Sequence, residues 1–377
     1  MRLYLDVQQA QESPPTRGLP RYVANHAAAL DARGDVVARV ALRSSLPVPP
    51  DFDDRLASSP RRCDNAAASF AAARAEGPLA YHVMSPFSSV PPLEESLPPW
   101  ALDGPLVVTL YDLIPLGDRG FYLREPFDRY YWSRLALLGA ADLVLAISRH
   151  AADDAVERLD LDPRRIAVIG GASDPCFAAP STLAASDVAS GLATLTRPFA
   201  MTVASGDPRR NVRRLLHAWA ALPRSVQHAH QLVVVGDLSG AEDLGELVGV
   251  ADELGLGTDD LVFTGPITDD LLRWLYQHTT LVVCPSLAEG FGLPAIEGCA
   301  AGAPVITSDT TSLPEIVDWP PSTFDPTSIG SMADAIERAL SSEPFRAELA
   351  AACTRAADRC SWESVAARTV DALGQMR

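Results

Sequence analysis

The chain alternates short apolar runs with segments of helical periodicity, and the alternation starts again after a break near residue 180. Runs such as Leu143–Ile147 carry no polar residue, which is typical of strands buried on both faces of a parallel sheet. Strands are expected at Arg2–Val7, Val36–Leu42, Ala80–Ser85, Leu106–Asp112, Asp142–Ser148, Arg165–Gly170, Phe199–Ala204, Gln231–Gly236, Leu261–Gly265, Leu281–Pro285 and Pro304–Ser308. Helices are expected at Pro20–Ala32, Pro126–Leu138, Arg149–Leu159, Asn211–Ala221, Ala241–Leu254, Asp269–His278 and Leu293–Ala301. This pattern predicts two doubly wound α/β domains with ligands at the carboxyl ends of the strands, in a cleft between them.

Length and composition agree with two domains, because 377 residues with 47 % hydrophobic content can fill two cores. Residues 1–178 are expected to form the N-terminal domain and residues 199–360 the C-terminal one. The stretch 179–198 begins with small, polar and proline residues and predicts an interdomain linker. Residues 361–377 predict a last amphipathic helix capped by Ser361.

Charge and composition exclude several classes of protein. A formal net charge of −17 repels nucleic acid. The chain contains no lysine, which excludes a Walker A loop and lysine Schiff-base or pyridoxal-phosphate enzymes, and leaves phosphate contacts to arginine. Its six scattered cysteines include no C-x-x-C pair and predict reduced thiols. No apolar run reaches the roughly 20 residues that span a bilayer, and Met1–Val7 predicts a strand rather than a signal peptide, so a cytoplasmic protein is expected.

The most informative stretch runs from Cys284 to Glu297, where a buried strand meets a helix. Gly290 and Gly292 let backbone N–H groups approach an anion, and the helix N-terminus adds about half a positive charge. This predicts a phosphate site that uses neither metal nor lysine. Glu289 and Glu297 on its two sides suit a sugar and a ribose diol. On spacing alone, a helix cap at Glu289 and a solvated Glu297 fit equally well.

The segment Glu289–Glu297 resembles the E-x7-E signature of retaining family 4 glycosyltransferases, in its EGFGLP-x-x-E form. The loop Ser205–Asn211 is similar to the family's "EPRKN" loop, with Arg210 where lysine is usual. Further segments that resemble the family in order and spacing are Gly18–Tyr22 ("GIGRY"), Tyr111–Pro115 ("HDLIP"), Ala301–Ile306 and Ser312–Ile316.

The resemblance implies a GT-B fold, with the nucleotide on the C-terminal domain, the acceptor on the N-terminal domain and a last helix that crosses back. It implies a bacterial polysaccharide-type enzyme, such as a mannosyltransferase, that takes a hexose from a nucleotide sugar without a metal or other cofactor. It also implies front-face substitution: the acceptor hydroxyl attacks from the side that the diphosphate leaves, and a phosphate oxygen takes its proton.

Site residues follow from the same resemblance. Catalytic roles are expected for Glu289, Arg210 and Asp112. Donor binding is expected for Arg209, Arg210, Gly290, Phe291, Gly292, Leu293, Glu297 and Gly18, and acceptor binding for Tyr111, Asp112 and Tyr130.

Besides Arg210, two further departures from the family pattern bear on these residues. Pro20 replaces the second glycine of "GIG" and removes an N–H group beside Gly18, and Tyr111 stands where many relatives carry histidine. Simpler interpretations stay open: a solvated helix start at Arg209 and Arg210, and a strand-end cap at Asp112.

Other functions also stay open at this point. One is a nucleotide-sugar epimerase on the same fold, and another is a sugar-binding protein without chemistry. Asp51-Phe52-Asp53 has the letters of a D-x-D metal motif but lies in a Pro-rich loop, and no metal site is expected. The sequence does not distinguish a GDP- from a UDP-linked donor, or a saccharide from a lipid-linked acceptor. The aromatic and Arg-rich stretch Phe121–Trp132 fits a packed helix face, an acceptor site or contact with the inner face of the plasma membrane.

Overall fold

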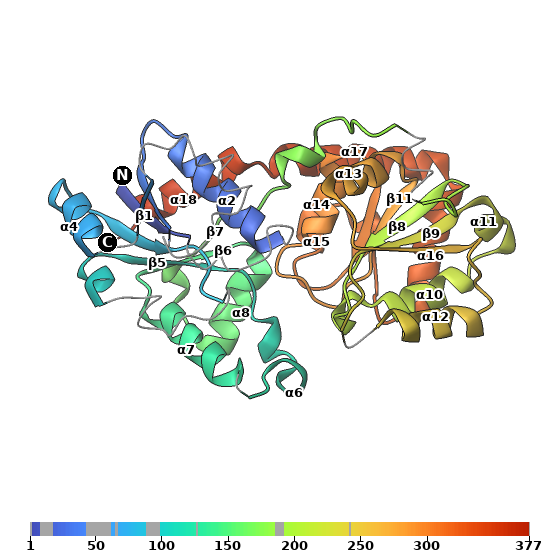
Figure 1. Ribbon diagram of the computed structural model, residues 1–377, viewed down its shortest axis with the longest axis horizontal. Coiled ribbons are helices and arrows are strands. Elements are labelled where there is room, and N and C mark those ends of the chain that lie inside the picture. Colours follow the sequence, from blue (N-terminus) through green and yellow to red (C-terminus); the bar gives the residue numbers. More distant parts are fainter. Residues whose placement is uncertain are drawn as a thin grey trace. The chain divides into compact units, whose positions relative to one another are not determined.

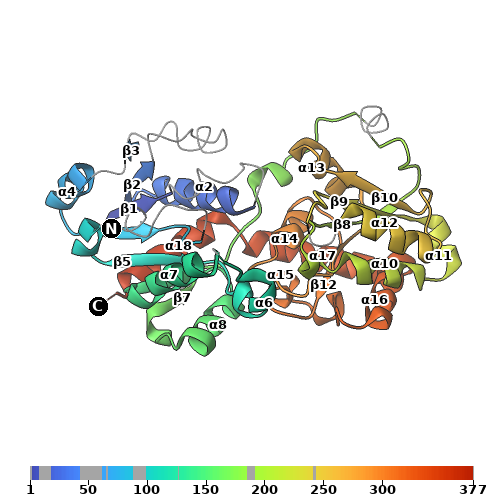
Figure 2. The ribbon, with the colours of Figure 1, turned by 60° about the horizontal axis from the view of Figure 1, so that its bottom comes forward.

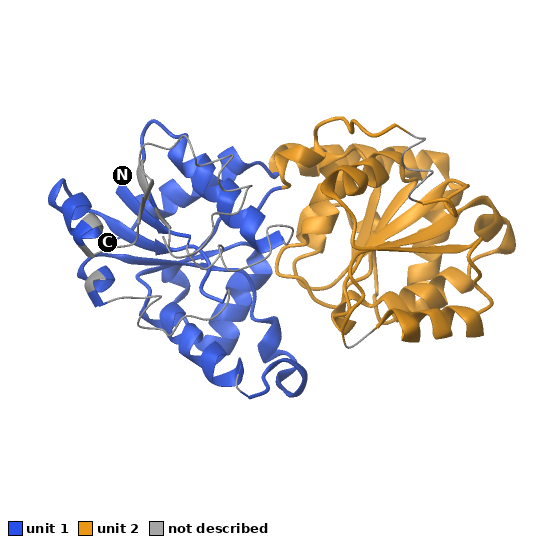
Figure 3. Ribbon diagram, viewed as in Figure 1, with its two compact units in different colours: residues 1–172, 360–377 blue, residues 173–359 orange. Residues whose placement is uncertain are grey.

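The chain folds into two compact units, which Figure 3 distinguishes by colour. One unit contains residues 1–172 and 360–377, and the other contains residues 173–359. The structure, a computed structural model, describes residues 2–7, 18–42, 62–64, 67–87, 99–125, 127–184, 192–240 and 243–376.

The first unit is built on a seven-stranded parallel sheet with the order β3-β2-β1-β4-β5-β6-β7. In its middle, Leu5 of β1 pairs with Val40 on one side and His82 on the other. Its strands are β1 (Arg2–Asp6), β2 (Val37–Leu42), β3 (Arg62–Asp64), β4 (Ala80–Val83), β5 (Leu106–Leu110), β6 (Leu143–Ala146) and β7 (Ile166–Val168).

Helices cover both faces of this sheet (Figures 1 and 2). On one face α4 (Ala67–Ala75), α7 (Phe127–Ala140) and α8 (Arg149–Leu159) contribute to a single apolar core. On the other face α2 (Gly18–Asp31) packs against the last helix, α18 (Trp362–Gly374). The short helix α6 (Arg119–Tyr122) precedes α7. Because α18 belongs to the first unit, the second unit lies in sequence between two segments of the first.

Buried polar groups fix the contact between α18 and α2. His26 on α2 and Thr369 on α18 are both fully buried, and His26 Nε2 lies 2.9 Å from Thr369 Oγ1. Ser361 caps α18, as the sequence predicts, by accepting a hydrogen bond from Ser364 N. The end of the chain is therefore held by specific contacts as well as by apolar packing.

The second unit is built on a six-stranded parallel sheet with the order β10-β9-β8-β11-β12-β13. Its strands are β8 (Phe199–Val203), β9 (Gln231–Val235), β10 (Leu261–Gly265), β11 (Leu281–Cys284), β12 (Val305–Ser308) and β13 (Thr323–Phe324). Helices cover both faces of this sheet (Figure 1). On one face lie α10 (Val212–Ala220), α11 (Arg224–Ala229), α12 (Leu244–Glu253) and α16 (Ile329–Ser341). On the other face lie α13 (Asp269–His278), α14 (Leu293–Ala300) and α17 (Glu343–Arg359), with the short α15 (Pro314–Val317) beside them.

The predicted fold class is confirmed: both sheets are parallel and covered by helices on both faces. Helices α4 and α17 were not predicted, because they are rich in alanine and show a weak contrast between apolar and polar positions. The amphipathic α16 and the short β3, α11 and β13 were not predicted either. Pro126 and residues 241–242, at the starts of two predicted helices, lie outside the described residues. Within the described ranges, every helix is too short or too polar to cross a bilayer.

Candidate functional site

The loop between β11 and α14 in the second unit favours glycine at the position just before the helix. Gly292, the residue at the N-cap of α14, has φ +106°, and a Cβ atom there would lie 2.8 Å from Leu313 Cδ2. The left-handed backbone favours glycine, and a Cβ atom would also force the Leu313 side chain to move. Pro294 follows within the first turn. Pro294 has no backbone N–H, and Ala295 N already donates to the Gly292 carbonyl at 3.0 Å, so the N–H groups of this helix start that can donate to an anion are those of Gly292 and Leu293.

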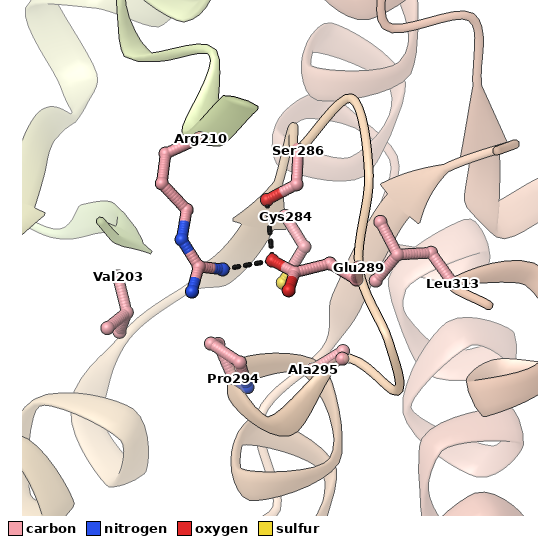
Figure 4. Close-up of a pocket in the computed structure, with 9 residues that line it drawn as sticks. Val203, Arg210, Cys284, Ser286, Glu289, Pro294, Ala295 and Leu313 are labelled. Atoms are coloured by element: carbon pink, nitrogen blue, oxygen red, sulfur yellow. Dashed lines mark hydrogen bonds and ion pairs between the residues drawn. The ribbon is translucent and has the colours of Figure 1, made fainter. Parts of the chain in front are cut away.

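Glu289 points inward beside this helix start (Figure 4). Its Oε1 atom accepts hydrogen bonds from Arg210 Nη1 and, at 2.8 Å, from Ser286 Oγ. Arg209 Nη1 lies 3.8 Å from the other oxygen, Oε2. Glu289 is 7 % exposed, and its carboxylate is therefore held between two guanidinium groups and a hydroxyl. The alternative of a helix cap at Glu289 is wrong, because Gly292 occupies the cap position.

The loop that carries the two arginines is anchored to the Glu289 loop. Arg209 Nε donates to Asp207 Oδ2 at 2.9 Å, and the Arg209 carbonyl accepts from Leu287 N at 2.7 Å. Asn211 is buried at φ +61°, and its Nδ2 atom donates to the carbonyls of Pro285 and Pro326, each at 2.9 Å. The loop therefore holds both arginines in place, while their side chains stay 24 % and 20 % exposed.

Arg210 keeps hydrogen-bonding capacity for a ligand. Its Nε atom is buried and has no hydrogen-bond partner among the described residues. The side chain as a whole is 20 % exposed, and it lines a pocket together with Ser286, Glu289 and Gly292. A guanidinium beside a helix N-terminus suits a diphosphate.

Glu297 lies one turn inside α14 and is 8 % exposed, so its interpretation as a solvated residue is wrong. Its Oε2 atom accepts a hydrogen bond from the hydroxyl of Tyr276 on α13 at 3.2 Å. Burial, and then the Glu297 carboxylate, raise the pKa of Tyr276 well above its usual range. Tyr276 therefore stays a hydrogen-bond donor that fixes Glu297.

The sequence predicts Tyr111 and Asp112 as acceptor-binding residues, and they follow β5 in the first unit. The Tyr111 hydroxyl donates to the Met84 carbonyl at 2.7 Å, and burial raises the Tyr111 pKa well above its usual range. Asp112 Oδ1 accepts from Ile114 N at 3.0 Å, which is the strand-end cap considered above. Burial, and then the Asp112 carboxylate, raise the pKa of Tyr131 on α7.

Gly18 and Tyr130 also belong to the first unit. Gly18 is the first residue of α2, and residues 8–17 before it lie outside the described part of the chain. The Tyr130 ring faces the Arg134 guanidinium, 4.9 Å from its centroid, and packs at 5.7 Å from Phe127.

Several residues around the site escaped the sequence analysis. Ser286 lies three residues before Glu289. This spacing was the only feature of the sequence that could have indicated its hydrogen bond to the Glu289 carboxylate. Tyr276 reaches Glu297 from another helix, so spacing could not reveal it. Asp51 and Asp53 lie outside the described residues. Within the described ranges, no three His, Cys, Asp or Glu side chains group as metal ligands would.

Family comparisons divide the chain much as the fold does. The profile described as "Glycosyltransferase Family 4" matches residues 16–175. The profile described as "Glycosyl transferases group 1" matches residues 187–358, which include Arg209, Arg210 and the whole Glu289–Glu297 segment.

Individual proteins agree with these matches. The serotype-specific mannosyltransferase WbdA of Escherichia coli is 33 % identical over 273 residues, which are 72 % of this chain and 33 % of WbdA. The O-antigen chain mannosyltransferase B of Escherichia coli is 28 % identical over 252 residues, 66 % of this chain and 65 % of that protein. The chain thus spans about one third of the length of WbdA.

A solved structure of Anabaena HepE in complex with UDP and glucose superposes with a TM-score of 0.73 at 19 % identity, covering 99 % of each chain. Sucrose-phosphate synthase from Thermosynechococcus elongatus superposes with a TM-score of 0.70 at 21 % identity, covering 100 % of this chain and 98 % of that one. The architecture is that of the GT-B enzymes, with two parallel α/β domains. The chain belongs to the glycosyltransferases of family 4.

Proposed function

We propose that the chain transfers a hexose from a GDP- or UDP-linked donor to a saccharide or lipid-linked saccharide, without a metal and with retention of the anomeric configuration. The observation that carries this proposal is the contact of Arg210 with Glu289 beside the N-terminus of α14. Mannose is the first sugar to test, because the names of the matched Escherichia coli proteins specify mannosyl transfer. Polysaccharide synthesis is the corresponding pathway class.

The charges at the site support separate roles for the residues that would bind the diphosphate, the sugar and the ribose of the donor. The diphosphate would accept hydrogen bonds from Arg210, Arg209 and the backbone N–H groups of Gly292 and Leu293, which lowers the cost of its departure. Glu289 would bind the donor sugar and steady positive character at its anomeric carbon. Glu297, fixed by Tyr276, would bind the ribose hydroxyls.

The reaction needs no separate protein base under this proposal. The acceptor oxygen bonds to the anomeric carbon on the face from which the diphosphate departs, and the acceptor proton passes to a phosphate oxygen. The protein contributes position and charge. Tyr111, Asp112 and Tyr130 of the first unit are proposed for the acceptor, and Gly18 for the donor.

An assay of nucleotide sugars with saccharide acceptors tests the proposal. GDP-mannose and UDP-glucose are mixed with the chain, with and without acceptor and with and without EDTA, and nucleoside diphosphate release and product anomer are measured. Acceptor-dependent release that survives EDTA and gives the donor's anomer is expected. An isomerised nucleotide sugar without acceptor would instead indicate an epimerase, and binding without release would indicate a sugar-binding protein.

A membrane-bound acceptor is consistent with one face of α7. Trp132 is 45 % exposed, and the Arg119 guanidinium lies 5.3 Å from the centroid of its ring. Such a pair suits the interface between lipid headgroups and acyl chains. We propose peripheral contact here with the inner face of the plasma membrane, tested by sedimentation with anionic vesicles. Trp132→Ser is expected to reduce binding, and equal binding by both forms would refute the contact.

A further inference from the structure

Three consecutive hydroxyl side chains after β12 hold the backbone of the Glu289 loop. Thr310 Oγ1 donates to the Leu287 carbonyl at 3.3 Å, and Ser312 Oγ donates to the Glu289 carbonyl at 2.9 Å. Thr311 Oγ1 accepts from the backbone N–H of Glu289 at 3.0 Å. Both backbone polar groups of Glu289 are therefore bound by neighbouring side chains of one short turn.

Thr311 makes its contact from an unfavourable backbone conformation. Its φ is +53°, in the left-handed region that β-branched residues rarely adopt. The other described non-glycine residues with positive φ are Asp160, Asn211 and Asp318, which are types that tolerate this region. Strain of this kind persists only where surrounding structure imposes it, and it is concentrated at functional sites.

We propose that Thr311 is a positioning residue for Glu289 and that its strained conformation sets the direction of the Glu289 side chain. This inference rests on the proposed role of Glu289 in sugar transfer. With its N–H and carbonyl both fixed, Glu289 has only side-chain torsions left, and Ser286 and Arg210 hold the carboxylate at their end. A misplacement of about 1 Å at a reacting group can cost about 100-fold in rate.

Three substitutions separate the hydroxyl from the backbone strain. Thr311→Ala removes the acceptor and keeps an unfavourable φ, so kcat with the active nucleotide sugar is expected to fall about tenfold with donor KM unchanged within about twofold. Thr311→Ser keeps the acceptor and is expected to restore most of kcat. Thr311→Gly removes both acceptor and strain, so kcat is expected to fall about tenfold without a loss of thermal stability.

Asp160→Gly is the matched control, because Asp160 is also left-handed, at φ +54°, but ends α8 in the first unit. It is expected to leave kcat unchanged. Wild-type kcat in both Thr311→Ala and Thr311→Gly would overturn the inference if Glu289→Gln is impaired in the same assay. Wild-type turnover by Glu289→Gln would overturn the proposed function itself. Thr311→Gly keeps the test valid if Thr311→Ala folds poorly.

Discussion

Replacing Glu289 with glutamine removes the carboxylate charge that Arg209 and Arg210 share, while preserving the shape of the side chain. The side chains of the two arginines are 24 % and 20 % exposed, and that of Glu289 is 9 % exposed. Breaking a buried pair costs about 3–5 kcal/mol, and a charge-assisted hydrogen bond contributes about 1.5–3 kcal/mol. Because solvent reaches these arginines, we expect the free energy of unfolding to fall by about 2 kcal/mol.

The same substitution should strengthen the binding of a nucleoside diphosphate. In the wild-type chain a diphosphate must compete with Glu289 for Arg210. Glu289→Gln removes that competitor, and a gain of about 1.4 kcal/mol corresponds to tenfold tighter binding. Turnover should nevertheless fall by about 100-fold or more, because the carboxylate that would steady the sugar's positive charge is gone.

Urea unfolding with and without a fixed concentration of GDP or UDP measures both effects, since a ligand stabilises by an amount set by its concentration relative to its Kd. Glu246→Gln is the control: Glu246 pairs with Arg213 at 3.3 Å on an exposed surface, where such a pair contributes about 0–1 kcal/mol. Equal stability of Glu289→Gln and wild type, together with equal stabilisation by the nucleotide, would refute the reasoning.

Three further predictions concern groups around the site and in the first unit. Tyr276→Phe removes the hydroxyl that binds Glu297, and calorimetric titration is expected to show weaker nucleotide binding by about 3- to 10-fold. Asn211→Ala leaves two buried carbonyls unpaired and is expected to cost about 2–4 kcal/mol in urea unfolding, whereas the same stability as wild type would contradict its bridging role. Burial lowers the pKa of His26 to about 3, below about 6.5 in an unfolded chain, so the unfolded state takes the proton first as pH falls. The contribution of His26 to the free energy of unfolding is therefore complete above about pH 6.5 and is lost as the pH falls toward 3. In unfolding curves measured across that range, His26→Gln should lose less stability than the wild type.

The sequence predicted the fold well where single strands carried their own signal. The run Leu281–Cys284 is apolar throughout and is a central strand, as expected. The alanine-rich α17 shows little contrast between apolar and polar positions, so its sequence did not indicate a helix. It nevertheless packs against α14 and so supports the helix behind the site. Local pattern therefore located the sheets better than the helices that cover them.

The site was predictable only where its residues are close in sequence. Gly292 and Glu289 were identified from one short segment, and the left-handed glycine confirms the turn expected there. The contact of Arg210 with Glu289 joins residues 79 positions apart, and sequence suggested both residues but not their pairing. Thr311 and Tyr276 act through single hydroxyls from other loops and helices, so no spacing rule could have identified them.

The central claim is that a diphosphate binds between Arg210 and the N-terminus of α14. A crystal structure of the chain with GDP or UDP tests it most directly. We predict diphosphate oxygens within hydrogen-bonding distance of the Arg210 guanidinium and of the backbone N–H groups at Gly292 and Leu293. A nucleotide bound elsewhere, with Arg210 still paired to Glu289, would contradict it.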